Sequence, residues 1–426
     1  MSAGAGRGKR ADASALTDFA GPQLAALGIV VATPAVFAIL TWFNGSLLHF
    51  SIPVLAALYG LIACCLLGGF KLQLALRNAR RSALAAAAGL GVSATLATLL
   101  VASHPADAAI HLGVTFVELV TGFCLWSLFS AGWALLRRPF LIALAIGILG
   151  QVIVGYCLML SARHVPHFDW VGFRAGTSHV RQLGFYGTAL CCLGAGLLAT
   201  AKTRPSRIVF FILTTIGFAW NDLSGGRAAF GGGIGGVLLV WLLAPKERRK
   251  QLALLLAGAF LLAMPLSLVV VPSPYWGLKS ILGRLFGFKT VQLFASGRLF
   301  LWIGALRGFL ASPLIGHGEG QFIFEVGGRL WNHPHDSILQ FLYQWGLIGT
   351  TCVLIMVGPI VTDIRRAARS APDVALPAGG ALVGLLLMSL LEGSLYHVFP
   401  VAVVAICLAI LASTDGQSEP AGETRR

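Results

Sequence analysis

The residues best suited to proton transfer lie in a short polar stretch, 331–337, that immediately precedes a long apolar run. It contains His333 and His335 with a proline between them, followed by Asp336 and Ser337. Proline disfavours helical backbone in the preceding residue, and aspartate or serine can cap the helix that the apolar run predicts. A neutral imidazole, whose ordinary pKa is about 6.5, can accept a proton from an attacking hydroxyl. We therefore expect His335 at a helix mouth as a general base; a structural hydrogen bond is the alternative.

A second polar segment lies upstream and could bind an anion. Ser296 is a candidate N-cap, because apolar residues over 299–310 recur at helical spacing. Arg298 would fall in the first turn of that helix, where free backbone N–H groups and the helix dipole favour negative charge. Gly316 and Gly318 follow, and glycines allow tight turns or the close approach of a ligand. A simple tight loop is the alternative for these glycines.

A third polar segment, 224–227, reads Ser-Gly-Gly-Arg and precedes a glycine-rich apolar run. The guanidinium of Arg227 could bind phosphate oxygens bidentately, or it could lie at the membrane interface with its stem buried. The glycines lack the Gly-Lys-Ser/Thr ending of a phosphate-binding loop and are more typical of close helix packing. Glu118, Glu392 and His397 are further polar residues to which the sequence assigns no role.

The elements that must position these residues are membrane spans. Of the 426 residues, 57% are hydrophobic and only 11% charged, and the mean hydropathy is +0.83. Soluble domains carry about a quarter charged residues, so a soluble globular protein is excluded. The net charge of +15 does not indicate nucleic-acid binding, because no basic stripe alternates with aromatic residues. The 8 cysteines all fall in apolar runs without a C-x-x-C pair, which predicts small core residues.

The apolar runs predict an all-α, polytopic transmembrane bundle of about twelve spans with one large, partly helical periplasmic loop. The runs fall at 24–42, 47–70, 82–102, 109–136, 139–161, 183–201, 208–220, 228–244, 251–271, 337–361, 376–394 and 398–412. The run 208–220 is short for a span and 228–244 begins with glycines, so this pair forms either two short spans or one re-entrant unit.

The predicted organisation has five parts. They are a cytoplasmic tail (1–23), spans one to nine (24–271), a periplasmic loop or lid that carries the active site (272–336), spans ten to twelve (337–412) and a second cytoplasmic tail (413–426). The sidedness follows from the basic residues, most of which fall in segments predicted to be cytoplasmic. The others fall in periplasmic segments: Arg163, Arg174, Arg181, Arg227, Lys279, Arg284, Lys289, Arg298, Arg307 and Arg329. Topology does not require these, so we expect some of them to bind an anionic partner.

One combination of motifs resembles a known family. His335-Asp336, then nine residues, then Gly-Leu-Ile-Gly at 346–349 is similar to the signature of the bacterial O-antigen ligase and O-antigen polymerase superfamily. The Ser-Gly-Arg-x-x-x-Trp pattern at 296–302, the glycine-rich segment 313–322 and one large late loop also resemble that family. The resemblance implies a multi-pass glycosyltransferase of the bacterial inner membrane. Its donor would be a glycan on undecaprenyl diphosphate, and it would need no metal or other cofactor.

The resemblance also implies roles for single residues. His335 matches the essential histidine, Arg298 the arginine of the large loop, and Arg227 the arginine of a Ser-Arg-Gly element. Two departures are Asp336, where Asn, Ser or Gln is usual, and the extra glycine before Arg227. The carboxylate of Asp336 could raise the basicity of the neighbouring histidine. We expect Asp336, His333 and the two glycines of the lid to support the site.

The chemistry implied is the attack of a sugar hydroxyl on an anomeric carbon. It needs a base on one side and stabilisation of the leaving diphosphate on the other. Without a metal, two or three arginines must supply that stabilisation. The family uses a further arginine in an earlier periplasmic segment, for which Arg181 is the candidate and Arg174 or Arg163 the alternatives. A single attack on an α-linked lipid diphosphate would invert the anomeric configuration.

Several functions remain open at this level. Ligation of O-antigen to lipid A-core in lipopolysaccharide biosynthesis is favoured over polymerisation of repeat units; a protein O-oligosaccharyltransferase is a third variant. A twelve-span transporter is disfavoured, because no internal pseudo-repeat is evident. The preference for ligation rests on a basic and aromatic strip suited to phosphorylated headgroups at an interface; a membrane anchor for the lid is the alternative. That strip comprises Tyr275, Trp276, Lys279, Arg284, Phe286, Phe288 and Lys289.

Overall fold

The computed structural model describes residues 21–43, 52–177, 179–267, 276–287, 297–328 and 330–414. It is 81% helical, and the described residues contain no β-strand. A helix pairs its backbone N–H and C=O groups internally, which is why apolar runs adopt it in a membrane. The predicted all-α class is therefore confirmed.

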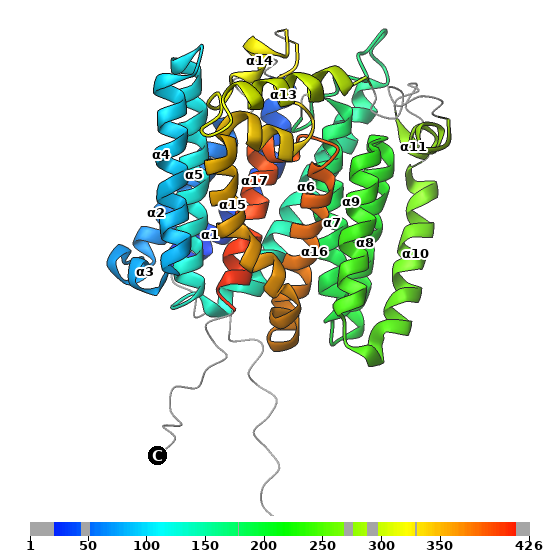
Figure 1. Cartoon of the computed structure of the whole chain (residues 1–426). Helices are drawn as coiled ribbons and strands as arrows, with labels where there is room; N and C mark the ends of the chain where they lie inside the picture. The colour runs from blue at the N-terminus through cyan, green and yellow to red at the C-terminus, as the bar shows by residue number, and fades with distance from the viewer. Residues whose placement is uncertain are drawn as a thin grey trace, which may run out of the picture.

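The helices follow the apolar runs closely. They are α1 (Gly21–Phe43), α2 (Ile52–Leu67), α3 (Leu72–Asn78), α4 (Arg81–Leu100), α5 (Pro105–Phe129), α6 (Arg137–Ala162), η3 (Val180–Gln182), α7 (Leu183–Ala199), α8 (Arg204–Ser224), α9 (Arg227–Leu243), α10 (Arg249–Ser267), α11 (Gly277–Phe286), α13 (Leu299–Ala311), α14 (Phe322–Glu325), α15 (Ser337–Ser370), α16 (Pro372–Ser389), η5 (Ser394–Tyr396) and α17 (Val398–Ala412). Among the described residues, 8 helical segments are long and apolar enough to cross a membrane, or 9 if the bent pair α2 and α3 is one span. Each of the predicted runs overlaps one of the helices (Figure 1), and the count of about twelve spans stays a prediction.

The short run 208–220 belongs to a longer helix than the sequence predicted. α8 has 21 residues, because Thr203 and Ser206 form a capping box at its start and Gly225 ends it with a left-handed φ of 64°. Its last turn continues through Asn221 and Asp222, which are polar but only 1% and 0% exposed. α8 and α9 are therefore two separate helices joined by a two-glycine turn.

The glycines of α9 form a helix-packing face, as the sequence predicted. A Cβ atom at Gly232 would lie 2.5 Å from the backbone oxygen of Gly384 in α16. A Cβ atom at Gly236 would lie 2.5 Å from the backbone oxygen of Gly380. The two backbones can approach this closely only because the side chains are absent.

α15 is broken near its start. Gly346 adopts φ 61° and ψ −163°, which separates a short outer segment from the long inner segment of this helix. The segment 313–318 lies against the break. Two of its N–H groups donate to carbonyl groups on the outer side, at 2.9 and 3.0 Å, and two N–H groups on the inner side donate to its carbonyls, at 2.8 and 3.0 Å. A Cβ atom at Gly316 or Gly346 would overlap the facing backbone, so these two glycines allow the pairing.

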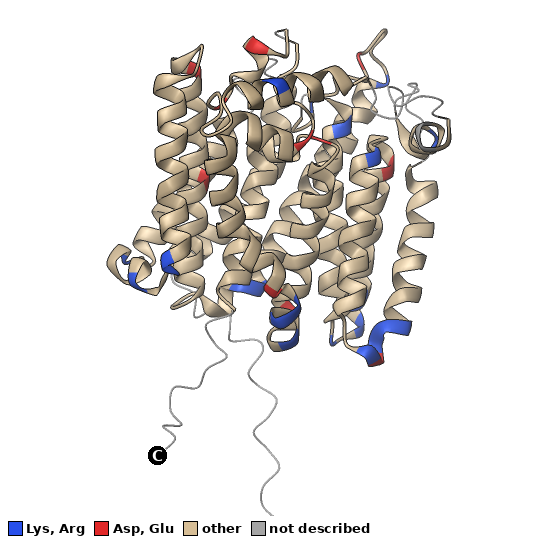
Figure 2. Cartoon of the chain, in the orientation of Figure 1, with Lys and Arg blue, Asp and Glu red and all other residues tan. Residues whose placement is uncertain are grey.

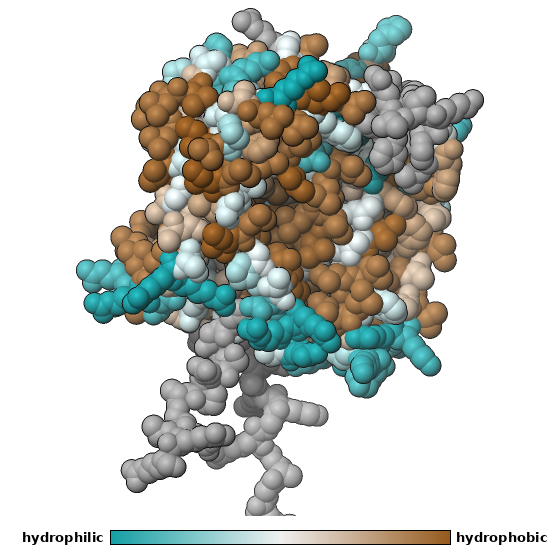
Figure 3. Space-filling view, viewed as in Figure 1, coloured by the Kyte–Doolittle hydropathy of each residue, from teal (hydrophilic) through white to brown (hydrophobic). Residues whose placement is uncertain are grey.

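Helices α11, α13 and α14 lie across one end of the bundle, which we call the lid end (Figure 1). Figure 2 shows Lys and Arg gathered densely at the opposite end and scattered at the lid end. Between the two ends, the visible side of the molecule is a broad band of hydrophobic residues (Figure 3). This distribution is the one expected of a bundle that crosses a membrane.

Trp276 does not belong to an exposed interface strip. It is 5% exposed, and its Nε1–H donates to the carbonyl of Trp170 at 2.8 Å. Its ring also packs edge-on against Trp170 and Phe173. It therefore fixes the start of α11 on the connection between α6 and α7. Several other predicted residues lie outside the described part of the chain: Tyr275, Phe288, Lys289, Ser296, Arg329 and the side chain of Arg284.

Candidate active site

The turn that carries His335 is built from its neighbours. His335 has a left-handed φ of 58°, which is uncommon for a residue with a side chain. Its N–H donates to Nδ1 of His333 at 3.1 Å, and Trp302 Nε1–H donates to the carbonyl of Pro334 at 3.0 Å. Asp336 then caps α15 by accepting from the N–H of residue 339 at 2.9 Å. The turn places His335 at the mouth of α15, as predicted.

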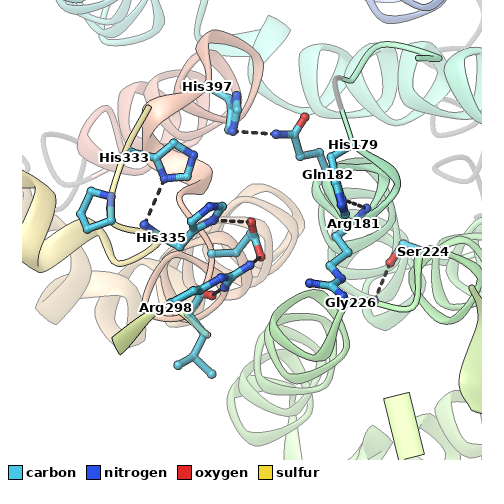
Figure 4. Close-up of polar contacts among 12 residues, drawn as sticks. His179, Arg181, Gln182, Ser224, Gly226, Arg298, His333, His335 and His397 are labelled. Atoms are coloured by element: carbon cyan, nitrogen blue, oxygen red, sulfur yellow. Dashed lines mark hydrogen bonds and ion pairs between the residues drawn. The ribbon is translucent and has the colours of Figure 1, made fainter. Parts of the chain in front are cut away.

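One carboxylate joins His335 to Arg298. Glu392, in the connection between α16 and α17, contacts His335 Nδ1 with Oε1 at 2.9 Å. Its Oε2 accepts from Arg298 Nη2 at 2.8 Å, and Arg298 Nη1 donates to the carbonyl of Leu391 at 2.5 Å. Figure 4 shows His335 and Arg298 close to each other. The contact brings together residues from three segments that are far apart in the sequence.

The tautomer of a neutral His335 follows from this contact. Burial by itself raises the pKa of Glu392, but Arg298 and His335 outweigh it and hold that pKa well below its usual range. A carboxylate only accepts hydrogen bonds, so a neutral His335 carries its proton on Nδ1. Its Nε2 then has a free lone pair, and no described residue is hydrogen-bonded to it. His335 can therefore accept a proton at Nε2.

His333 is a buried support for the turn. It is 4% exposed, and its ring packs against the rings of Tyr396 and His397, with centroids 4.8 and 5.5 Å away. A Cβ atom at Gly393 would overlap the ring. Burial and the neighbouring His335 hold the pKa of His333 well below its ordinary value. Its Nδ1 can therefore serve as a neutral acceptor for the N–H of His335.

Arg298 and Arg181 lie on two sides of the same gap (Figure 4). Arg298 was predicted in the first turn of a helix, but the structure makes it the N-cap of α13, one position earlier, with a side chain that is 12% exposed. A guanidinium has five N–H donors, so the contacts of Arg298 with Glu392 and with the carbonyl of residue 391 leave donors for an anion. Arg181 follows His179, whose Nδ1 accepts the N–H of Arg181 at 3.2 Å. Burial lowers the pKa of His179 to about 4, which keeps that acceptor neutral.

The remaining predicted arginines do not line the cavity described below. Arg227 begins α9, and the charge of Arg298 acts on it, but it does not line the cavity. Arg163 and Arg174 are exposed and do not line it either. Of the three early candidates, the structure therefore brings Arg181 to the site.

A cavity of about 2280 Å³ adjoins these groups. Arg181, Arg298, His333, His335 and Glu392 line one part of it, and it continues between α5, α15 and α17. Most of its remaining lining is apolar. It combines a large apolar space with a few convergent polar groups, as ligand sites do.

Two predicted supports act differently from expectation. Gly316 and Gly318 do not line the cavity; the segment that contains them pairs with the broken part of α15. Asp336 is a helix cap, and the carboxylate bonded to His335 is Glu392. His333 accepts the backbone N–H of His335, and Asp336 caps α15. These two neighbours of His335 therefore shape the turn, and neither is hydrogen-bonded to the imidazole of His335.

Sequence reasoning named Glu392 without a role. One signal could have found it: Glu392 is an acidic residue near the end of the predicted apolar run 376–394, where topology does not require a charge. Intramembrane or interfacial charges of this kind usually have a partner. The partner itself could not be read from the sequence, because it lies 57 residues away.

Comparisons with known proteins bear on this site. Residues 208–354 match a family model described as O-antigen ligase. The matched range runs from α8 through the lid to the inner part of α15 and includes Arg227, Arg298 and His335. A search of curated proteins found no match. The family match supports the resemblance that the motifs indicated.

Proposed function

We propose, from the premise that the chain is O-antigen ligase-like, that it is a membrane glycosyltransferase. It transfers a glycan from undecaprenyl diphosphate to a hydroxyl group of an acceptor sugar. The observation that carries the proposal is the shared carboxylate, since Glu392 holds His335 Nδ1 at 2.9 Å and Arg298 Nη2 at 2.8 Å. A base and a cation held side by side suit the attack of a hydroxyl on a diphosphate-linked sugar.

The reaction proceeds by a single displacement. The acceptor oxygen bonds to the anomeric carbon while its proton passes to Nε2 of His335, and Glu392 stabilises the imidazolium that forms. The bond between the anomeric carbon and the diphosphate oxygen breaks, and the diphosphate leaves with the electron pair. Arg298 and Arg181 balance its negative charge from two sides, with Arg227 adding positive charge nearby. The anomeric configuration is inverted.

The lid end faces the periplasm in this proposal. The support is the dense group of Lys and Arg at the opposite end, since basic residues are retained on the cytoplasmic side (Figure 2). Lys279→Cys in α11 tests it with a membrane-impermeant thiol reagent, against the wild-type protein as background control. Labelling in intact spheroplasts is expected; labelling only after the inner membrane is breached would reverse the topology.

The acceptor in this proposal is lipid A-core. A deletion strain is the direct test, because ligation and polymerisation leave different products. Loss of all O-antigen from lipid A-core, with long chains accumulating on the lipid carrier, is expected. Lipid A-core that carries a single repeat unit would instead identify a polymerase.

The chemistry is tested with purified protein, undecaprenyl-diphosphate-linked glycan and lipid A-core. Wild-type protein is expected to transfer the glycan, and Arg298→Lys and Arg181→Lys are each expected to lose at least about tenfold in kcat/KM. Lysine keeps the charge but loses the planar fork that binds two phosphate oxygens. Wild-type rates in both variants would show that these arginines do not bind the diphosphate.

A further inference from the structure

Two helices present polar side chains to the same cavity, next to His335. On α15 they stand at intervals of three and four residues, and on α5 at intervals of four and three, so each set lies along one helix face. The residues are Ser337, Gln340 and Gln344 on α15, and His111, Thr115 and Glu118 on α5. Polar side chains in membrane helices carry an unfavourable desolvation free energy and usually mark a functional site.

Three of these side chains contain a buried oxygen without a hydrogen-bond partner. They are Ser337 Oγ, Gln340 Oε1 and Glu118 Oε1, in side chains that are 2%, 3% and 7% exposed. A buried polar atom left unpaired costs about 1–3 kcal/mol. All three oxygens can accept a hydrogen bond, and the serine hydroxyl and a protonated carboxyl group can also donate one. A sugar hydroxyl, which both donates and accepts, is therefore complementary to these atoms.

Glu319, in the lid, adds a further polar side chain to this part of the cavity. It is 5% exposed and lines the cavity. Its Oε2 accepts from Thr115 Oγ1 at 2.8 Å, and its Oε1 accepts from Trp345 Nε1 at 3.2 Å. Glu319 also acts electrostatically on Glu118. Burial raises the pKa of Glu319 to about 7, so this side of the cavity presents buried carboxyl groups to a ligand in place of the arginines.

This polar part of the cavity is close to the proposed base. The ring centroids of His333 and His335 are 4.2 Å apart, and those of His333 and Tyr396 are 4.8 Å apart. The ring centroid of Tyr396 in turn lies 6.1 Å from that of His111 on α5. A glycan of two or three sugars that placed a hydroxyl at His335 could reach these polar side chains along the rings.

We propose that Ser337, Gln340, Glu118, Glu319 and Thr115, which we call the acceptor wall, bind the sugar that is attacking. The inference rests on the proposed glycosyl transfer and names the chemistry of one substrate: the reacting end of the acceptor is an uncharged sugar whose hydroxyl groups donate to the wall. The cavity is thereby divided at His335. The diphosphate of the donor binds on the arginine side, and the acceptor sugar binds on the carboxyl side.

The test uses Gln340→Leu and Glu118→Leu in the full-length protein. We expect KM for lipid A-core to rise at least about tenfold in each, with KM for the lipid-linked donor unchanged. Because each change removes an unpaired buried oxygen, thermal stability should be unchanged or higher. Thr351→Val is the matched control, since it removes a hydroxyl from an exposed position on α15 outside the cavity and should change neither KM.

Other outcomes separate the two proposals. An unchanged KM for lipid A-core in an active Gln340→Leu or Glu118→Leu protein would overturn the acceptor wall and leave the proposed transfer standing. Loss of stability without a change in KM would show a structural role. If the wild-type protein transfers nothing, binding of lipid A-core to the His335→Ala protein still tests the wall: weaker binding after adding Glu118→Leu supports it, and equal binding rejects it.

The charge of the acceptor is tested separately. Oxidising the primary hydroxyls of the lipid A-core glycan to carboxylates should slow transfer, because the new charges would be buried beside two carboxyl groups without a guanidinium to balance them. The double variant Glu118→Gln and Glu319→Gln should recover part of the activity with the oxidised acceptor. Equal use of the oxidised and native acceptors by the wild-type protein would contradict an uncharged subsite.

Discussion

Two histidine–glutamate pairs stand at the lid end and have nearly the same geometry. His317 Nδ1 lies 2.7 Å from Glu325 Oε2, and His335 Nδ1 lies 2.9 Å from Glu392 Oε1. They differ at the second ring nitrogen. Nε2 of His317 contacts the carbonyl of Gly308 at 2.8 Å, whereas Nε2 of His335 has no described hydrogen-bond partner and its side chain lines the cavity.

This difference separates a structural histidine from the proposed base. Both partners of His317 are acceptors, so only the doubly protonated ring satisfies both contacts. Glu325 also accepts from Tyr343 Oη at 2.6 Å and from Ser103 Oγ at 2.8 Å, which ties the lid to α15 and to the connection before α5. The second carboxylate oxygen of Glu392 goes instead to Arg298. A His–Glu pair therefore acquires its role from what surrounds it.

The sharpest test replaces each histidine by alanine. His335→Ala should reduce kcat for glycan transfer by about 10²–10⁴-fold in a protein that stays folded, because it removes the proposed base. His317→Ala should leave kcat within a few-fold and lower the melting temperature. Equal losses of activity in the two variants would contradict the distinction between the proposed base and the structural histidine.

The carboxylates give the second largest effect. Glu392→Gln should reduce kcat by about 10²-fold, because a neutral amide no longer fixes the tautomer of His335 or balances Arg298. Glu325→Gln is the control with the same change of atoms and should affect stability more than kcat. Steady-state kinetics and thermal unfolding of both proteins measure the contrast. A Glu392→Gln enzyme with wild-type kcat would remove this carboxylate from the mechanism.

The support of the turn gives a smaller effect. His333→Ala should lower kcat by about tenfold, since the left-handed backbone of His335 loses the acceptor for its N–H. His333→Asn should recover most of that loss, because an asparagine side chain commonly accepts from the N–H two residues ahead. Failure of asparagine together with success of His333→Leu would show that the ring only fills space.

The smallest effect concerns pH and the lid. The hydrogen bond with Glu325 raises the pKa of His317 above its ordinary value, against the opposite effect of burial. The stabilisation is therefore complete below about pH 6.5 and is lost as the pH rises through the raised pKa. Hydrogen exchange over 299–326 should become faster on going from pH 6 to pH 9, after correction for intrinsic rates. In His317→Gln, the amides of 299–326 should exchange fast at both pH values, because the lid loses about 1–3 kcal/mol of stability. Faster exchange at pH 6 than at pH 9 in the wild-type protein would contradict the prediction.

Much of the helix layout could be predicted because hydropathy reports membrane spans directly. The prediction missed the true length of α8, since its outer turn contains Asn221 and Asp222, whose burial inside the bundle hydropathy cannot detect. His335 was found through its neighbours in the sequence. Its partner Glu392 was not, because the contact depends on how the connection between α16 and α17 packs against the lid.

The glycines illustrate the same limit. The sequence predicted tight turns or the close approach of a ligand at Gly316 and Gly318. The structure shows the close approach of a backbone at Gly316 and a turn with a left-handed φ of 87° at Gly318. The need for glycine could be predicted from the residue type. What approaches Gly316 could not, because it belongs to a helix later in the chain.

The break in α15 determines where segments can be exchanged when chimeric proteins are made from related sequences. Segment 313–318 and the helix around Gly346 are two motifs in the sequence, but four backbone hydrogen bonds make them one unit. A chimera that receives the lid of a relative up to residue 326 while keeping its own α15 combines two segments whose backbones do not match each other. Chimeras in which residues 297–349 are replaced together should assemble, and those with a junction between the two motifs should be degraded.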